Sequence, residues 1–155
     1  MIDDPTSGTG ALPPLPDDRR RLFQILNSST APLWLAMIIL PRSRLTARLV
    51  SLATPLLAAL GVTYSGLLVA GIARGGEMVD FRDPDSIRAA LGTPDAFLAG
   101  WTHYLAFDLF VGRWILEDAN ARGTSARLPL LLTWMAGPAG LTLHLARRRR
   151  HPLPG

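Results

Sequence analysis

Four long apolar segments, separated by short polar stretches, dominate the sequence. They cover about residues 22–40, 49–73, 96–116 and 128–146. A helix needs roughly 20 residues to cross the hydrocarbon core of a bilayer. Backbone groups in lipid must find hydrogen-bond partners within their own segment, which favours helices as the spanning form. The pattern therefore predicts an all-α fold, a four-helix transmembrane bundle.

The residues beside these segments set the limits of the predicted domain. Residues 1–18 are rich in Pro, Gly and Asp and have little to bury, which predicts a disordered N-terminal tail. Residues 19–150 then form a single membrane domain. Thr93 and Pro94 have the residue types of an N-cap and a first helical position, so they are expected to open the third helix. Pro138 predicts a kink in the fourth helix.

The distribution of positive charge predicts an orientation. All 16 basic residues are Arg, and the formal net charge is +4. Blocks at 19–21, 42–48 and 147–150 flank apolar segments, which is typical of membrane topology signals and not of a nucleic-acid surface. With four spans, both termini lie on one side of the membrane. The segments on that side hold ten Arg and the other two loops hold five, so both termini are predicted to be cytoplasmic.

The composition excludes several kinds of site. The chain has no Cys, so disulfides, thiolate metal ligands and Cys nucleophiles are absent. Its three histidines, His103, His144 and His151, have no paired ligand spacing, so no metal site is predicted. No cofactor is predicted either.

Asp108 is the polar residue that most needs an explanation, because it lies near the middle of the third apolar segment. A carboxylate at the centre of a membrane helix costs roughly 2.5–3.5 kcal/mol on insertion scales. Asp108 is therefore expected to have a partner, a water-filled cavity or a neutral side chain. Both a functional role and a structural hydrogen bond between helices fit this position.

Helix geometry limits which residues can act together with Asp108. At about 100° per residue, Trp101, Tyr104 and Asp108 share one face of the third helix. His103 and Arg113 each lie five residues from Asp108, so each points about 140° away from it. A site that used all three ionisable residues would have to wrap around the helix or recruit other helices.

Three polar residues have both a packing and a functional interpretation. Arg113 can extend to the membrane interface and meet Glu117 one turn on, or it can act on a ligand. His103 can be a hydrogen-bonded packing group or a proton-transfer group. Asn27 can repair the kinked backbone of the first helix, or it can line the same cavity as Asp108.

Three stretches of the sequence resemble one protein family. "NSSTAPLWLAMIILPR", "WTHYLAFDLFVGRWI" and "LPLLLTWMAGPAGLTLHLARR" are similar to the abscisic-acid-deficient-4-like family of small integral membrane proteins. Plant members are required to form neoxanthin, an allenic xanthophyll, from violaxanthin, so the resemblance implies a role in carotenoid metabolism. It covers roughly residues 22–149 and rests on Asn27, Trp34, Pro41, Trp101, His103, Tyr104, Asp108, Gly112, Arg113, Pro129, Gly137, Pro138 and Gly140.

The chemistry that the resemblance implies is a non-redox isomerisation. Converting an epoxide to an allenic alcohol requires a proton delivered to the epoxide oxygen and another removed from a neighbouring carbon. The resemblance implies catalytic roles for Asp108 as the acid, His103 as the base and Arg113 or Tyr104 in steadying the developing alkoxide. The candidate substrate-binding residues are Asn27, Trp34, Trp101 and Tyr104.

Two classes of function are compatible with these residues. The first is a carotenoid or isoprenoid isomerase-like enzyme, and the second is a non-catalytic carotenoid- or lipid-binding protein that assists a partner enzyme. A transporter is less favoured, because four short helices without an internal repeat leave little room for alternating access. The expected partners are a lipophilic small molecule such as a carotenoid, the membrane and, through small residues on the helices, a helix-mediated oligomer. The Arg-only basic residues favour the inner membrane of a bacterium, with a multi-pass topology.

Overall fold

The computed structural model describes residues 12–74 and 79–150, and within these ranges it contains α-helices and no strands. The prediction of an all-α fold is confirmed. Two stretches, Asp17–Ile39 and Arg44–Ala73, are long and apolar enough to cross a membrane. The helices are α1 (Asp17–Ile39), α2 (Arg44–Ser51), α3 (Ala53–Ala73), α4 (Pro84–Leu91), α5 (Pro94–Ala121), α6 (Arg127–Ala136) and α7 (Pro138–Arg148).

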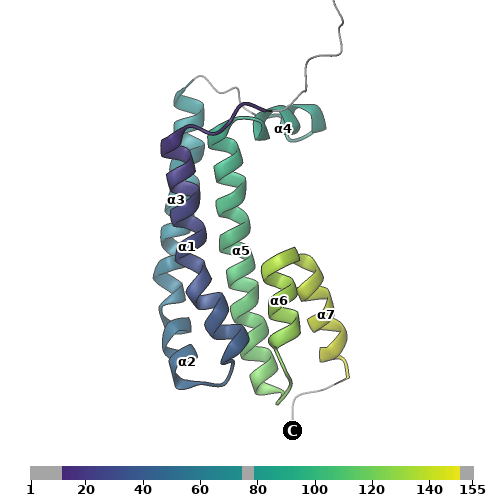
Figure 1. Ribbon diagram of the computed structural model, residues 1–155. Coiled ribbons are helices and arrows are strands. Elements are labelled where there is room, and N and C mark those ends of the chain that lie inside the picture. Colours follow the sequence, from purple (N-terminus) through teal and green to yellow (C-terminus); the bar gives the residue numbers. More distant parts are fainter. Residues whose placement is uncertain (1–11, 75–78, 151–155) are drawn as a thin grey trace, which may run out of the picture.

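Three long helices, α1, α3 and α5, pack side by side and form the body of the molecule (Figure 1). Helices α1 and α5 run in one direction and α3 runs in the other. The start of α5 therefore lies at the same end as the start of α1 and the end of α3. We call this the Asp95 end, and we call the opposite end, where α5 finishes, the Asp118 end. Only Leu52 separates α2 from α3, so these two helices together form one long apolar rod.

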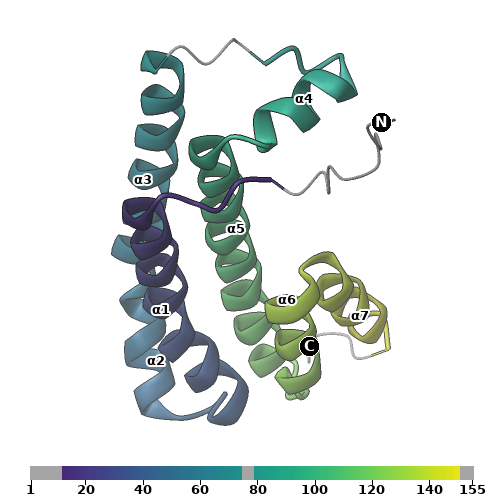
Figure 2. The same ribbon diagram turned by 45° about the horizontal axis from the view of Figure 1, so that its top comes forward.

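The single fourth helix expected over residues 128–146 is not formed. The chain turns at Gly137, whose φ is +43°, and α6 and α7 fold back against each other as a hairpin. Figures 1 and 2 show this hairpin beside the part of α5 that is nearer the Asp118 end. At 1.5 Å per residue, α6 and α7 are each about 15–17 Å long, half of what a span requires.

Glycine explains why this segment turns instead of kinking. Pro138 has no amide hydrogen with which to continue α6, and Gly137 accepts a positive φ without steric cost. Gly140 lies in the hairpin seam, where a side chain would overlap Thr133 and the backbone of Pro129. The apolar pattern alone does not distinguish two half-length helices from one full-length helix.

The hairpin also changes the expected arrangement of the termini. Arg148 of α7 contacts Asp118, whereas Arg19 of α1 contacts Asp95. The described part of the chain therefore begins at the Asp95 end and finishes at the Asp118 end, whereas four full-length helices would return it to the end where it began. Helix α1 also begins at Asp17, inside the predicted disordered tail, and residues 1–11 of that tail lie outside the described ranges.

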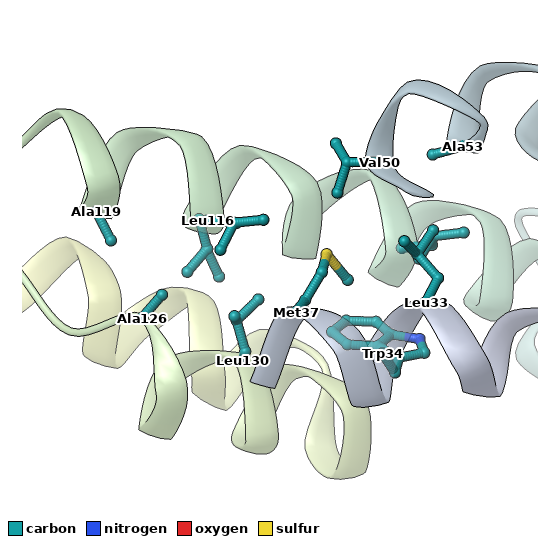
Figure 3. Close-up of a cluster of buried hydrophobic side chains, with 11 residues drawn as sticks. Leu33, Trp34, Met37, Val50, Ala53, Leu116, Ala119, Ala126 and Leu130 are labelled. Carbon is teal, nitrogen blue, oxygen red and sulfur yellow. The ribbon is translucent and has the colours of Figure 1, made fainter. Parts of the chain in front are cut away.

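The main core lies where α1, α5 and α6 meet, towards the Asp118 end (Figure 3). Met37, Leu109 and Leu130 have no exposed surface. The indole of Trp34 sits close to the backbone of α5, because a Cβ built on Gly112 would lie 2.5 Å from its ring. This close approach is what the absence of a side chain at Gly112 permits.

Helix α3 is apolar but the protein covers little of it. Only Ala53, Leu60 and Leu67 of this helix are buried, whereas Val62 is 74% exposed and Val69 66% exposed. A helix that is apolar on all sides is normally found in a protein core or in lipid. Because the protein itself does not cover α3, its surface favours lipid as the surroundings.

Replacing Gly140 by Ala is expected to destabilise the hairpin, because the added methyl group overlaps the backbone of α6. Overpacking of this kind costs about 1–3 kcal/mol. The matched control is Gly61→Ala in α3, where nothing lies within 4 Å of the added Cβ. Thermal unfolding in detergent should show a lower midpoint for Gly140→Ala and an unchanged or raised midpoint for Gly61→Ala. Equal midpoints for the two variants would contradict the close packing of α6 on α7.

Candidate functional site

Asp108 lies half-buried in the middle of α5 and faces the turn of the hairpin. A Cβ built on Gly137 would lie 3.1 Å from Asp108 Oδ1, so the carboxyl group packs directly against this glycine. No hydrogen bond or ion pair joins the Asp108 carboxyl to any residue of the ranges 12–74 and 79–150. Of the expected site residues, Asp108 therefore keeps its oxygen atoms available to a ligand.

Aromatic residues continue from Asp108 along the same face of α5. Phe97, Trp101, Tyr104 and Asp108 are spaced by four, three and four residues, and we call this row the α5 strip. Tyr104 is 63% exposed, so the middle of the strip is open to the surroundings. Figures 1 and 2 show α4 near one end of α5 and the hairpin near the other, with neither covering the helix between them.

Asn27 and Trp101 contact each other across the seam between α1 and α5. The indole N–H of Trp101 donates a hydrogen bond of 2.9 Å to Asn27 Oδ1. The ring of Phe23 lies 5.3 Å from that of Trp101, measured between centroids. Two of the expected substrate-binding residues are thus brought together, and their hydrogen bond fixes the indole at the edge of the α5 strip.

The other expected site residues have different neighbours. Arg113 donates to Glu117 Oε1 at 2.8 Å and to Thr54 Oγ1 at 3.2 Å, which links α5 to α3. The ring of His103 stacks on Phe107 with a centroid distance of 4.4 Å. Arg113 is thus engaged by Glu117 and Thr54, whereas His103 lies near enough to interact electrostatically with the Asp108 carboxyl. The structure therefore does not join all three expected catalytic residues in one set of contacts.

Trp34 has a packing role in this structure. It is 1% exposed, and its ring stacks on Trp134 of α6 at a centroid distance of 6.2 Å. An indole that is so fully covered has almost no surface to offer a substrate. We therefore assign Trp34 to the core between α1 and the hairpin.

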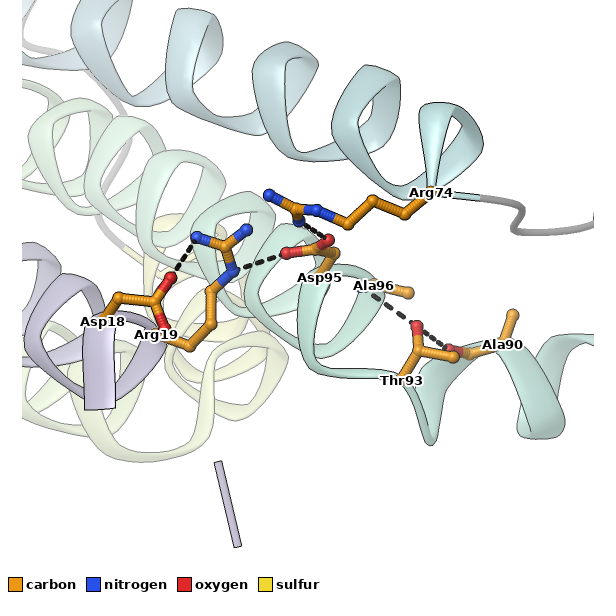
Figure 4. A network of polar contacts seen from close by, with 7 residues as sticks. All are labelled: Asp18, Arg19, Arg74, Ala90, Thr93, Asp95 and Ala96. Carbon is orange, nitrogen blue, oxygen red and sulfur yellow. Dashed lines mark hydrogen bonds and ion pairs between the residues drawn. The ribbon is translucent and has the colours of Figure 1, made fainter. Parts of the chain in front are cut away.

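An ionic cluster joins three helices at the Asp95 end (Figure 4). Arg19 of α1 donates from Nε to Asp95 Oδ1 at 2.6 Å, and Arg74, which follows α3, contacts Asp95 Oδ2. Asp95 itself is buried. Thr93 caps α5 here by accepting a hydrogen bond from the amide of Ala96, as the sequence predicts. A hollow of about 1430 Å³ lies beside this cluster, and none of the expected site residues lines it.

A second ionic cluster joins α5 to α7 at the Asp118 end. Asp118 accepts hydrogen bonds from Arg122 at 2.8 Å, from His144 at 3.0 Å and from Arg148 at 3.2 Å. The His144 ring meets the edge of Trp114 at a centroid distance of 5.2 Å. Because an ionised carboxylate can only accept, His144 must carry its hydrogen on Nε2.

The charge of Asp118 is stabilised by these partners. Asp118 follows the apolar segment of α5, which ends at Leu116. Burial by itself would raise the pKa of its carboxyl, but hydrogen bonds from Arg122 and His144 and the charges of Arg148 and Arg122 lower that pKa below its ordinary value. Asp118 is therefore ionised at neutral pH. The sequence signal for Arg122 was its spacing of four residues from Asp118, whereas no local signal pointed to His144.

The described residues contain no cluster of three or more His, Asp or Glu that could hold a metal ion. His151, one of the three histidines considered above, lies outside the described ranges.

Comparison with family models identifies the group to which these features belong. The model described as ABA DEFICIENT 4-like matches residues 21–144, which is about four-fifths of the sequence. The chain belongs to the ABA DEFICIENT 4-like family. The resemblance noted from the sequence is thereby confirmed. The match runs from α1 into α7, so Asp108, the hairpin turn and Asp118 all lie within the ABA DEFICIENT 4-like region. Comparisons with curated proteins and with solved structures gave no match.

Proposed function

We propose that this ABA DEFICIENT 4-like protein crosses a membrane three times, through α1, through α2 with α3, and through α5. The hairpin of α6 and α7 enters from the Asp118 end and leaves on the same side. The separation of the ionic clusters supports this arrangement. Asp95 and Asp118 are 23 residues apart on one helix, or about 35 Å, close to the roughly 30 Å of a hydrocarbon core.

The charges favour one orientation in the proposed membrane. Six Arg residues of the described ranges lie at the Asp95 end and nine lie at the Asp118 end, with Arg113 between them. The positive-inside rule then assigns the Asp118 end to the cytoplasm. The proposed location is the cytoplasmic membrane of a bacterium.

We further propose that the protein binds a carotenoid or a related isoprenoid along the α5 strip and isomerises it without a redox step. The observation that carries this proposal is the Asp108 carboxyl, which lies at mid-helix without a protein donor. Ionisable groups at such a depth are expensive and are usually functional. The exposed aromatic ring of Tyr104 gives a long apolar molecule a surface that it can reach from the bilayer.

Asp108 can supply both halves of the proposed chemistry. In its protonated form it gives its proton to an epoxide oxygen, and the C–O bond breaks to leave a hydroxyl group. The resulting carboxylate can then remove a proton from a neighbouring carbon, which forms the new carbon–carbon double bond and regenerates the acid. No atoms or electrons are gained or lost. This scheme needs neither His103 nor Arg113 at the reacting atoms, in keeping with their other contacts.

A specific observation also favours a second candidate function. Arg113 is engaged with Glu117 and Thr54, and the Asn27 amide oxygen accepts from Trp101. A protein whose polar groups mainly join helices can bind a carotenoid and present it to a partner enzyme without acting on it. The two candidates differ in whether the bound pigment changes.

The topology is testable by labelling, because the chain contains no Cys. Single cysteines can replace three exposed residues: Phe81 between α3 and α4, Ser125 between α5 and α6, and Arg149 after α7. In intact cells, a maleimide that cannot cross the membrane should label position 81 and leave positions 125 and 149 unlabelled until lysis. Labelling positions 125 and 149 from opposite sides would indicate a spanning fourth helix and would contradict the hairpin.

Asp108→Asn should abolish the proposed chemistry, because an amide cannot deliver the proton. The chain is expressed in a bacterium that makes an epoxide-bearing carotenoid, and the pigments are separated by chromatography and mass. A product of unchanged mass should appear with the parent chain and fall at least tenfold with Asp108→Asn. The matched control is Asp17→Asn, an exposed carboxyl at the start of α1, which should retain the product.

The alternative outcomes separate the two candidate functions. In one outcome, the pigments stay unchanged, and carotenoid co-purifies with the parent chain but not with Asp108→Asn. This result would exclude the enzyme and support the carotenoid-binding protein. Unchanged pigments and no bound carotenoid would overturn both candidates. A full yield of product from Asp108→Asn would remove Asp108 from the mechanism.

A further inference from the structure

The position of α7 depends on few contacts outside the hairpin. Helix α6 is anchored on the body of the molecule, because Leu130 is fully buried and Trp134 stacks on Trp34. Helix α7 packs mainly on α6 and touches α5 less extensively. Its polar contacts with α5 come from His144 and Arg148, which both bind Asp118.

These contacts place α7 in a definite register beside α5. The two helices run in the same direction, with Gly137 beside Asp108 and Arg148 beside Asp118. The rise from Gly137 to Arg148 is about 16 Å, and the rise from Asp108 to Asp118 is about 15 Å. A contact at Asp118 therefore sets the height of the hairpin turn relative to Asp108.

The cluster is built to hold one geometry. The side chains of Asp118, Arg122 and His144 are almost fully buried. The guanidinium of Arg148 lies over the ring of Trp114, 5.6 Å from its centroid. Charge-assisted hydrogen bonds within a buried cluster are stronger and more directional than those at a surface. Removing one partner leaves a charge buried without compensation.

We propose that Asp118, His144 and Arg148 form a latch that positions the hairpin turn against Asp108, and that they are positioning residues for the chemistry at that carboxyl. The role of these residues in the chemistry at Asp108 rests on the proposed function. Their role in holding the hairpin turn does not. With the latch closed, the turn limits how far a ligand on the α5 strip can extend past Asp108. With the latch open, α7 moves relative to α6, and the backbone at Gly137 no longer packs against the Asp108 carboxyl.

The test measures the hairpin turn directly. Spin labels are attached to cysteines at Ala139, in the first turn of α7, and at Ile25 of α1, both of which are exposed. The parent chain in lipid should give a narrow distance distribution between these labels. Asp118→Asn and His144→Phe should each broaden that distribution at least twofold. Asp118→Glu, which keeps the charge, should restore most of the narrow distribution.

Two further variants make the result decisive. Arg148→Ala removes the most exposed partner of the latch and should broaden the distribution less than Asp118→Asn does. The matched control Asp85→Asn changes an exposed carboxyl of α4 and should leave the distribution unchanged. Narrow distributions in both Asp118→Asn and His144→Phe would overturn the latch.

Pigment analysis of the same variants separates the latch from the proposed function. If both hold, Asp118→Asn lowers product formation several-fold while the amount of chain in the membrane stays the same, and Asp118→Glu recovers product. If the distributions broaden but no variant changes the pigments, the latch stands and the proposed chemistry fails. If Asp108→Asn abolishes the product but the latch variants neither broaden the distribution nor lower the product, the chemistry stands and the latch fails.

Discussion

The backbone turn at Gly137 is the constraint on which the rest of the structure depends. Its positive φ ends α6 halfway along α5, and Pro138 prevents the helix from resuming in the same direction. Residues 127–148 therefore return to the end of the molecule from which they came. This gives three full-length helical rods and a hairpin, and it places a side-chain-free backbone against the Asp108 carboxyl. In a bilayer, such half-helices are tolerated only where protein or a cavity shields their ends.

The polar groups of α5 divide into two kinds. Asp95 and Asp118 stand near the ends of the helix, about 35 Å apart. Arg19 and Arg74 reach Asp95 from α1 and the end of α3, and Arg148 reaches Asp118 from α7. These clusters join α1, α3 and α7 to α5 where polar headgroups would lie. Asp108 stands between them without a donor among the described residues. Asp95 and Asp118 therefore join helices, whereas the Asp108 carboxyl packs against Gly137 and makes no such contact among the described residues.

Local signals predicted much of the fold but little of the site. The apolar segments gave α1, α3 and α5, and Thr93 with Pro94 marked the start of α5. The spacing of Arg113 and Glu117 predicted their ion pair. The hairpin was missed because a hydropathy profile records how apolar each residue is and not the path of the backbone. An apolar segment that turns back therefore has the same profile as one that continues straight. The contacts of Asn27 with Trp101 and of Asp118 with His144 join distant residues, and only the packing of the helices brings them together.

The central claim is that residues 127–148 turn back on themselves. Its most direct measurement is the distance between spin labels on cysteines at Leu128 and Arg149, both of them exposed, with the protein in lipid. A continuous helix would separate these 21 residues by about 32 Å. The hairpin predicts a distance well below that value, because α6 begins and α7 ends at the Asp118 end. A single population near 32 Å would contradict the hairpin. It would also contradict the packing of Gly137 against the Asp108 carboxyl.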